Sequence, residues 1–140
     1  MLYIREAELK HGRVAMLAAA GFLVAEPFHP LFDGSIEVPS YIAFQATPLQ
    51  TFWPIVVGAL FLIEATSAIT TFENPLEGGW WTLKSDHPTG DLGFDPLGLK
   101  PTNAAELKET QTKELQNGRL AMLGIAGMVA QELVNGQKLF

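Results

Sequence analysis

The sequence predicts an all-α membrane protein with three transmembrane helices, of which the first and third form a crossed pair. Three observations support this fold class. The chain of 140 residues is 48% hydrophobic and only 17% charged, against about 25% charged in soluble domains. Three apolar stretches are long enough to span a bilayer, and an internal repeat relates the first to the third. The length allows a single domain, residues 1–140.

The first span is expected at residues 4–26. Its uncharged part begins at Val14, and the 22 residues from Ile4 to Ala25 form a helix of about 33 Å. This length matches a hydrocarbon core of roughly 30 Å. Pro27 and Pro30 follow directly and end the helix, because the residue before a proline avoids the helical conformation.

The second and third spans are expected at residues 50–72 and 103–135. The second carries one charge, Glu64, has Pro54 in its first turn, and ends before Pro75. The third begins with a polar helical lead, residues 103–113, and is interrupted by Arg119 and Glu132. A soluble bundle of three buried helices is the alternative, and the second stretch disfavours it because it lacks a polar face.

The distribution of charged residues orients the spans in the membrane and excludes several functions. No Lys or Arg lies between Val14 and Leu83, whereas basic residues flank the first span and fill the loop after the second. The positive-inside rule therefore puts the N-terminus on the cytoplasm-equivalent side. The net charge of −6 disfavours nucleic acid as a partner. The absence of cysteine excludes disulfides, zinc ribbons and thiol nucleophiles, and no catalytic motif is present, so we expect no enzyme.

An ungapped repeat at an offset of 106 residues relates the first and third spans. Ten of 22 aligned positions are identical: Glu8/Glu114, Leu9/Leu115, Gly12/Gly118, Arg13/Arg119, Ala15/Ala121, Met16/Met122, Leu17/Leu123, Ala20/Ala126, Gly21/Gly127 and Glu26/Glu132. The two spans run in the same direction and can pack about a two-fold axis along the membrane normal. Glycine and alanine at the crossing allow the two backbones to approach closely.

The charges of the repeat predict two reciprocal ion pairs. Glu8 and Arg13 are five residues apart, a spacing that does not allow pairing within one helix. Under two-fold symmetry Glu8 meets Arg119, and Glu114 meets Arg13. Each carboxylate then keeps unused lone pairs.

His11 and Asn117 follow each glutamate by three residues and add uncharged ligand atoms. Such scattered single ligands suit a metal already held in a macrocycle better than a protein-only metal cage.

The two copies, Glu8-Leu-Lys-His-Gly-Arg-Val-Ala-Met and Glu114-Leu-Gln-Asn-Gly-Arg-Leu-Ala-Met, resemble the paired signature of the chlorophyll-binding light-harvesting complex family. Gly90-Asp-Leu-Gly-Phe-Asp-Pro-Leu-Gly-Leu resembles the family loop before the third span. His11, with the stretches at 28–32 and 38–45, is similar to the chlorophyll a/c, red-lineage branch associated with photosystem I.

The resemblance implies roles for individual residues. Each chlorophyll Mg would have one axial ligand from the chain, and these ligands are Glu8, His11, Glu64, Glu114, Asn117 and Gln131. Arg13 and Arg119 would neutralise the paired glutamates. The segment Asp95, Pro96 and Leu97 would help hold one carotenoid end group. Glu64 has no evident arginine partner, so a Mg ligand or a protonated carboxyl is expected there, with a packing carboxylate as the alternative.

Several weaker candidates remain open. His29 and His87 lie in loops, where solvent exposure is the commoner outcome, and Gln45 and Gln50 could ligate at the entrance to the second span or only form interfacial hydrogen bonds. The family often carries a second Phe-Asp-Pro-Leu loop before the first span. This sequence begins only a few residues before Glu8, so either one carotenoid site ends differently or the natural chain starts earlier.

The resemblance implies a light-harvesting antenna apoprotein of the plastid thylakoid membrane with a stromal N-terminus. Its cofactors would be chlorophyll a, chlorophyll c and xanthophyll-type carotenoids. Its partners would be photosystem core subunits, neighbouring antenna proteins and thylakoid lipids. One alternative is photoprotective dissipation, which needs acid-sensing carboxylates on the lumenal side, where only Asp33 and Glu37 are evident. Another alternative is a small channel or transporter subunit, which the self-pairing of the charges disfavours.

Overall fold

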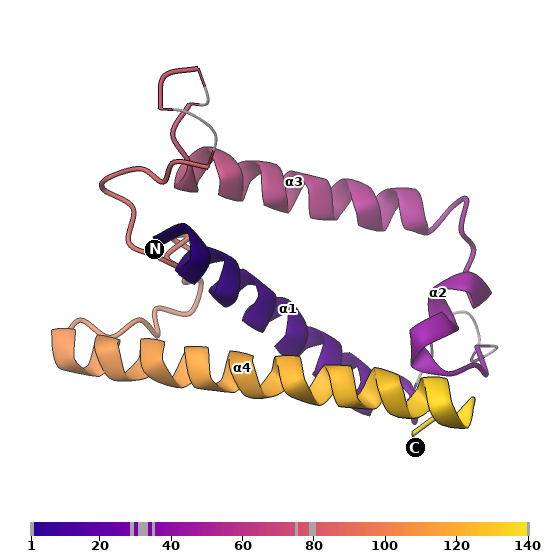
Figure 1. Ribbon diagram of the computed structural model, residues 1–140. Helices are drawn as coiled ribbons and strands as arrows, with labels where there is room; N and C mark the ends of the chain where they lie inside the picture. The colour runs from indigo at the N-terminus through magenta and orange to yellow at the C-terminus, as the bar shows by residue number, and fades with distance from the viewer. Residues whose placement is uncertain are drawn as a thin grey trace.

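A computed structural model describes residues 2–28, 30, 34, 36–74, 76–78 and 81–139. These residues are mostly helical, and the described part of the chain contains no strand beyond an isolated bridge between Phe72 and Leu83. In chain order the elements are α1 (Leu2–Ala25), the 3-10 turn η2 (Ser40–Ile42), α2 (Ala43–Ala46), α3 (Trp53–Thr71) and α4 (Ala104–Asn135). Figure 1 shows α1 lying across α4, while α3 runs alongside and makes few contacts with either.

Local sequence explains where the long helices begin and end. Pro54 occupies the first turn of α3, where its missing N–H costs nothing. The Asn103 side chain caps the start of α4 by accepting a hydrogen bond from the N–H of Ala105 at 3.1 Å. Gly136 ends α4 in the left-handed conformation at φ 65°. The three predicted helical segments and the polar lead into the third are thus confirmed as helices, with ends shifted by a few residues.

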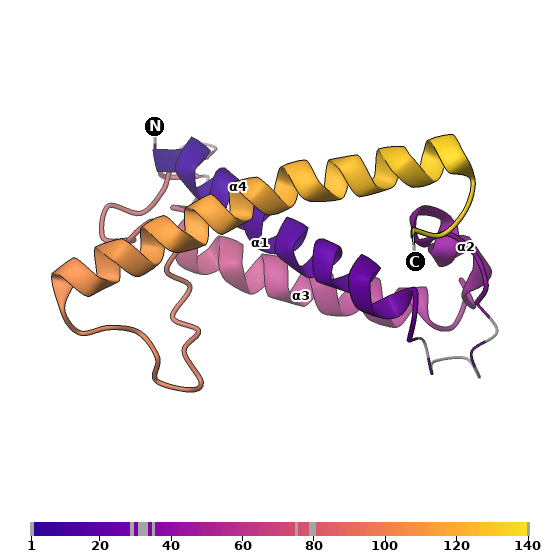
Figure 2. The same cartoon turned by 90° about the horizontal axis from the view of Figure 1, so that it is seen from below.

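The crossing of α1 and α4 is the centre of the molecule, as Figure 2 shows from below. A Cβ added to Gly12 would lie 3.0 Å from the Cα of Gly118, and a Cβ on Gly118 would lie 3.0 Å from the Cα of Gly12. The equal distances place a local two-fold axis between the two glycines. Leu9 and Leu115, which are also related by the repeat, are each 7% exposed beside this contact. The expected crossed pair is therefore present.

Helix α3 buries almost nothing against the rest of the chain. It is the one helix in the described part of the chain that is long and apolar enough to cross a membrane, and only 11% of its most apolar window is buried. Two contacts join it to α1. Near one end, the rings of Tyr3 and Phe72 have centroids 6.2 Å apart, and Lys10 reaches Glu64 at 2.9 Å.

The molecule exposes more surface than a soluble protein of its size, and many of the exposed side chains are large and hydrophobic. The accessible surface is 10257 Å², whereas a folded soluble monomer of this mass exposes about 7,100 Å². Three hydrophobic side chains in the described part are buried, Leu9, Ala15 and Leu115. The exposed set on α3 includes Ile55, Phe61, Leu62 and Ile69. An apolar surface of this extent marks a site of contact with a membrane, another protein or another apolar group.

Candidate functional site at the helix crossing

Two ion pairs lie on either side of the crossing. The Arg119 Nε donates to Glu8 Oε1 at 2.6 Å, and the Arg13 Nε donates to Glu114 Oε1 at 2.7 Å. These are the reciprocal pairs expected from the repeat. In both glutamates the second oxygen, Oε2, has no hydrogen-bond partner among the described residues. Each pair therefore presents one neutralised carboxylate with an unused ligand atom.

The loop between α3 and α4 makes the two pairs unequal. The Nη2 of Arg13 donates to the carbonyl oxygen of Gly90 at 2.7 Å, in addition to its bond with Glu114. The Arg13 side chain is 32% exposed, whereas that of Arg119 is 55% exposed. The loop thus covers one half of the crossing and leaves the other half open.

Gly90 is also held by a buried acid that the sequence analysis missed. Glu6 is only 2% exposed, and its Oε2 accepts a hydrogen bond from the Gly90 N–H at 2.6 Å. His87 Nε2 lies 3.5 Å from the same oxygen, and its side chain is 7% exposed. The expectation that His87 faces solvent is therefore wrong, because the loop folds it against α1. His29 lies outside the described residues.

The remaining ligand candidates of the repeat point away from the ion pairs. His11 is exposed, and its Nδ1 lies 2.7 Å from the Ala7 carbonyl oxygen. If Nδ1 carries the proton in this contact, Nε2 is left as a lone-pair donor. Asn117 and Gln131 are exposed on α4. All three side chains can reach groups outside the protein.

Glu64 has a partner that the sequence analysis did not identify. Lys10 Nζ lies 2.9 Å from Glu64 Oε2 across the gap between α1 and α3. No arginine pairs with Glu64 among the described residues, as expected, but a lysine does, because its stem is long enough to extend from the neighbouring helix. The expected role of Glu64 as a Mg ligand or a protonated carboxyl stays a prediction. The Glu64 side chain is 66% exposed, and its Oε1 has no partner among the described residues.

Asp95, Pro96 and Leu97 form an exposed turn at the outer end of the same loop. Both Asp95 oxygens accept backbone hydrogen bonds, from the N–H of Leu99 at 2.9 Å and of Lys100 at 3.0 Å. The pKa of Asp95 is lowered chiefly by the Lys100 N–H and then by the Leu99 N–H. The carboxylate therefore shapes the turn, while Leu97 remains 77% exposed and able to contact an apolar group.

Two buried glutamates join the far ends of α1 and α4, away from the ion pairs at the crossing. Glu132 is fully buried and accepts hydrogen bonds from the N–H groups of Ser40 at 3.2 Å and Tyr41 at 2.9 Å. Glu26, its repeat equivalent, accepts from the Ser40 hydroxyl at 2.8 Å and from the Leu139 N–H at 2.9 Å. Glu26 and Glu132 occupy equivalent positions of the repeat, and this equivalence was the sequence signal for the pair, although no role was inferred from it.

Gln45 and Gln50 are both exposed near the start of α3, with no hydrogen bond from either side chain among the described residues. Trp53, close by, donates from Nε1 to the Thr47 hydroxyl at 2.6 Å. Neither glutamine is brought near the crossing, so the structure does not connect them to the ion-pair site.

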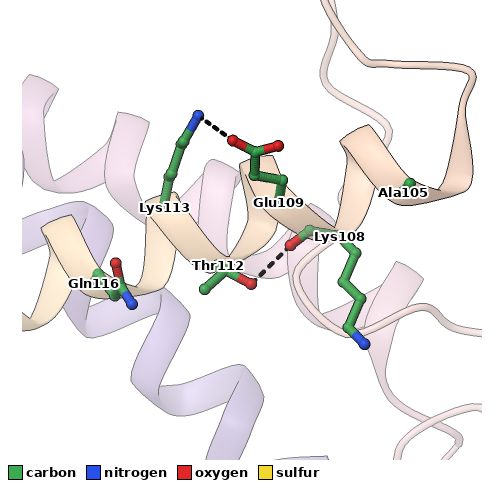
Figure 3. A pocket seen from close by; sticks show the side chains of 6 residues that line it. All are labelled: Ala105, Lys108, Glu109, Thr112, Lys113 and Gln116. Atoms are coloured by element: carbon green, nitrogen blue, oxygen red, sulfur yellow. Dashed lines mark hydrogen bonds and ion pairs between the residues drawn. The ribbon is translucent and has the colours of Figure 1, made fainter.

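The surface hollows lie away from the crossing. Figure 3 shows one along the first turns of α4, lined by Ala105, Lys108, Glu109, Thr112, Lys113 and Gln116. It is shallow, and its Lys113 and Glu109 form an ion pair at 2.7 Å within the helix. None of the predicted ligands lines it, so we assign it no role.

The fold and the crossing define a class of protein: a helical scaffold with a small protein core, neutralised carboxylates with unused oxygens, and a large apolar surface for non-protein groups. Comparison with known proteins identifies the family. The model of the chlorophyll A-B binding protein family matches residues 1–133. The chain belongs to this family, whose members bind chlorophyll, harvest light and are not enzymes.

Three relatives illustrate the range of similarity. The chain is 50% identical over 97% of its length to light-harvesting complex stress-related protein 1 of Chlamydomonas reinhardtii. It is 43% identical over 95% of its length to a fucoxanthin-chlorophyll a-c binding protein of Isochrysis galbana. It is 34% identical over 94% of its length to chlorophyll a-b binding protein 4 of Arabidopsis thaliana. All three relatives are chloroplastic, and the matches cover 55%, 64% and 54% of their lengths.

Proposed function

We propose that this chain is a light-harvesting antenna apoprotein that passes excitation energy to a photosystem, photosystem I in particular. In this proposal residues 1–140 form one domain of the plastid thylakoid membrane. Helices α1, α3 and α4 span the bilayer, and the N-terminus is stromal. The family supports the light-harvesting role. The lysines and arginines near the start of α1 and between α3 and α4 support the orientation.

One observation carries the proposal: both ion pairs at the crossing neutralise a glutamate and leave its Oε2 unused. A carboxylate oxygen is a suitable axial ligand for Mg²⁺, and a paired arginine removes most of the cost of placing the charge in an apolar medium. The exposed apolar surface of α1, α3 and α4 suits the ring and tail of chlorophyll. The residues present therefore fit the pigment.

Individual residues would hold the pigments by single axial bonds to Mg. The proposed ligands are Glu8, His11, Glu64, Glu114, Asn117 and Gln131. The exposed turn at Asp95, Pro96 and Leu97 would hold a carotenoid end group. When bound, chlorophyll a and chlorophyll c would supply the absorption of light and the transfer of excitation. The rigid crossing fixes the positions of the ligand atoms, and the apolar helix surfaces exclude water from them.

The test is refolding of the full chain with a pigment extract that contains chlorophyll a, chlorophyll c and xanthophylls. We expect a stable complex with a red chlorophyll absorption band, and loss of one chlorophyll per chain in Glu114→Leu, which removes every ligand atom from the side chain. The exposed Glu109→Leu variant is the control, because Glu109 pairs with Lys113 in its own helix. A complex without bound chlorophyll would refute the antenna role, and full pigment content in Glu114→Leu would remove Glu114 from the ligands.

A photoprotective role is the second candidate function. Two observations favour it: the similarity to a stress-related relative, and the buried Glu26 and Glu132, which lie at the same end of the molecule as Glu37. Glu37 is therefore not the only carboxylate at that end of the described part of the chain. The chlorophyll fluorescence lifetime of the complex separates the two roles. An antenna keeps a long lifetime at neutral and at mildly acidic pH, whereas a dissipating protein shortens it on acidification.

A further inference from the structure

The loop residue Gly90 is fixed through both of its backbone polar groups by side chains of α1. Its N–H donates to Glu6 Oε2 at 2.6 Å, and its carbonyl oxygen accepts from Arg13 Nη2 at 2.7 Å. Glu6 and Arg13 are seven residues apart, two turns of helix, and so lie on the same face. The loop therefore docks on α1 at one residue, between an acid and a base.

Only glycine allows the loop to approach this closely. Gly90 has φ of +82°, and a Cβ at this position would lie 2.6 Å from Leu9 Cδ1. Leu9 is buried at the crossing. The contact therefore joins the loop to the helix crossing itself and not to a mobile surface side chain.

The same contact reaches a proposed chlorophyll ligand. Arg13 uses Nη2 for Gly90 and Nε for Glu114 Oε1 at 2.7 Å. A guanidinium is planar and rigid, so fixing one of its nitrogens on Gly90 fixes the direction in which Nε holds Glu114. The connected series runs from Glu6 through Gly90 and Arg13 to Glu114.

The repeat provides an internal comparison. Thr112 stands at the position equivalent to Glu6, and Arg119 has Glu8 as its one side-chain partner in the described part of the chain. Nothing equivalent to Gly90 contacts Arg119 there. A substitution of Glu6 should therefore affect the site at Glu114 and leave the site at Glu8 unchanged.

We infer that Glu6 is a positioning residue for the chlorophyll bound at Glu114, acting through Gly90 and Arg13. This inference rests on the proposed function, since it requires Glu114 to be a ligand. Glu6 itself is buried at 2% exposure, and its Oε2 is occupied by Gly90 with His87 Nε2 nearby. It orients the ligand without contacting the pigment.

The experiment compares four variants of the full chain refolded with the same pigment extract. Glu114→Leu and Glu8→Leu define the absorption change caused by emptying each glutamate site. Glu6→Ala removes the acceptor for Gly90, and loss of a hydrogen bond to a charged group corresponds to roughly tenfold weaker binding at the Glu114 site. Glu6→Gln keeps an acceptor oxygen at the same place and should restore binding. We expect the Glu6→Ala difference spectrum to match that of Glu114→Leu and not that of Glu8→Leu.

Each outcome decides between the two claims. Loss of chlorophyll in Glu114→Leu with an unchanged spectrum in Glu6→Ala overturns the positioning role alone. No loss in Glu114→Leu overturns the ligand assignment on which the role rests. If Glu6→Ala does not refold, Glu6→Asp retains the charge but withdraws the oxygen by one methylene. An altered Glu114 band in that variant supports the role, and an unaltered band overturns it.

Discussion

The two halves of the helix crossing have the same ion pair in different surroundings. On one side Arg13 joins Glu114 and also the carbonyl oxygen of Gly90, whereas on the other side Arg119 joins Glu8 and stands 55% exposed. The glycines at the axis are equivalent, since a Cβ on either would lie 3.0 Å from the opposite Cα. An internal repeat can thus produce two equal ion pairs, and a single loop is enough to make the surroundings of the two glutamates different.

The largest expected effect separates the two arginines. Arg13→Leu removes the partner of Glu114 and the second hydrogen bond to Gly90. The free energy of unfolding should fall by an amount on the order of 3 kcal/mol. This value is at the lower end of the range for breaking a buried ion pair, because Arg13 and Glu114 are both about one-third exposed. Arg119→Leu removes one exposed pair and should destabilise less. Denaturant unfolding of the two pigment complexes measures the difference, and equal losses would mean that the loop contact contributes nothing.

Substitutions of the two glycines at the axis should cost equal stability, unlike substitutions of the two arginines. Gly12→Ala and Gly118→Ala each place a methyl group 3.0 Å from the opposite Cα, which forces the backbones apart and should cost about 1–3 kcal/mol. Gly124→Ala is the matched control, since nothing lies within 4 Å of its position and alanine favours the helix by up to about 1 kcal/mol. Markedly different losses at Gly12 and Gly118 would contradict the local two-fold symmetry.

Two loop glycines allow us to measure how much the docking of the loop stabilises one half of the crossing. Gly90→Ala forces a left-handed backbone on alanine, at about 1–2 kcal/mol, and adds a methyl group 2.6 Å from Leu9 Cδ1. Gly93→Ala carries the same type of backbone cost at φ +69° with open space around it. The loss of stability in Gly90→Ala beyond that in Gly93→Ala, measured by thermal unfolding, reports the docking of the loop on α1. Equal losses would show that docking is unimportant for stability.

The smallest expected effect concerns pH and the outer turn of the same loop. Lys100 and Leu99 N–H groups lower the pKa of Asp95, and the hydrogen bond from Lys100 lowers that of Asp91. A lowered folded-state pKa means that both carboxylates stabilise the loop above their unfolded pKa, about 3.9. This contribution is lost as the pH falls through the lower folded-state pKa.

At neutral pH, Asp95→Asn should mimic that loss locally. Amide hydrogen exchange at Leu99 and Lys100 should become faster while exchange at the helix crossing stays unchanged. Asp86→Asn serves as the control, because Asp86 is exposed and accepts no hydrogen bond among the described residues. Unchanged exchange at Leu99 would show that backbone geometry alone holds the turn.

The sequence predicted the features that depend on local pattern or on duplication. The three long helices follow from apolar length and proline positions, and the reciprocal ion pairs follow from the repeat combined with helical spacing. The contact of Lys10 with Glu64 was missed because it joins α1 to α3, which the repeat does not relate. Its geometry depends on how far apart the two helices stand.

The docking of the loop could be predicted only in part. Glu6 and Arg13 share one face of α1, which indicates a common neighbour, but nothing in the sequence says that this neighbour is Gly90. The path of the loop is set by several backbone positions with positive φ, Gly90, Gly93 and Gly98 among them. The burial of His87 follows from that path and so could not be inferred from its place before a proline.

The contact between Gly12 and Gly118 also determines how the angle between the two helices can change. The helices are closest at these glycines and are joined there by the two ion pairs, so a change in their angle is largest at their ends. Glu26 and Glu132 lie fourteen residues beyond the two glycines, about 21 Å along each helix. A change of about 5° in the angle would move them by roughly 2 Å relative to the glycines. Because Ser40 bonds to both carboxylates, it ties the two helix ends together, and with them the spacing of the outer helix surfaces.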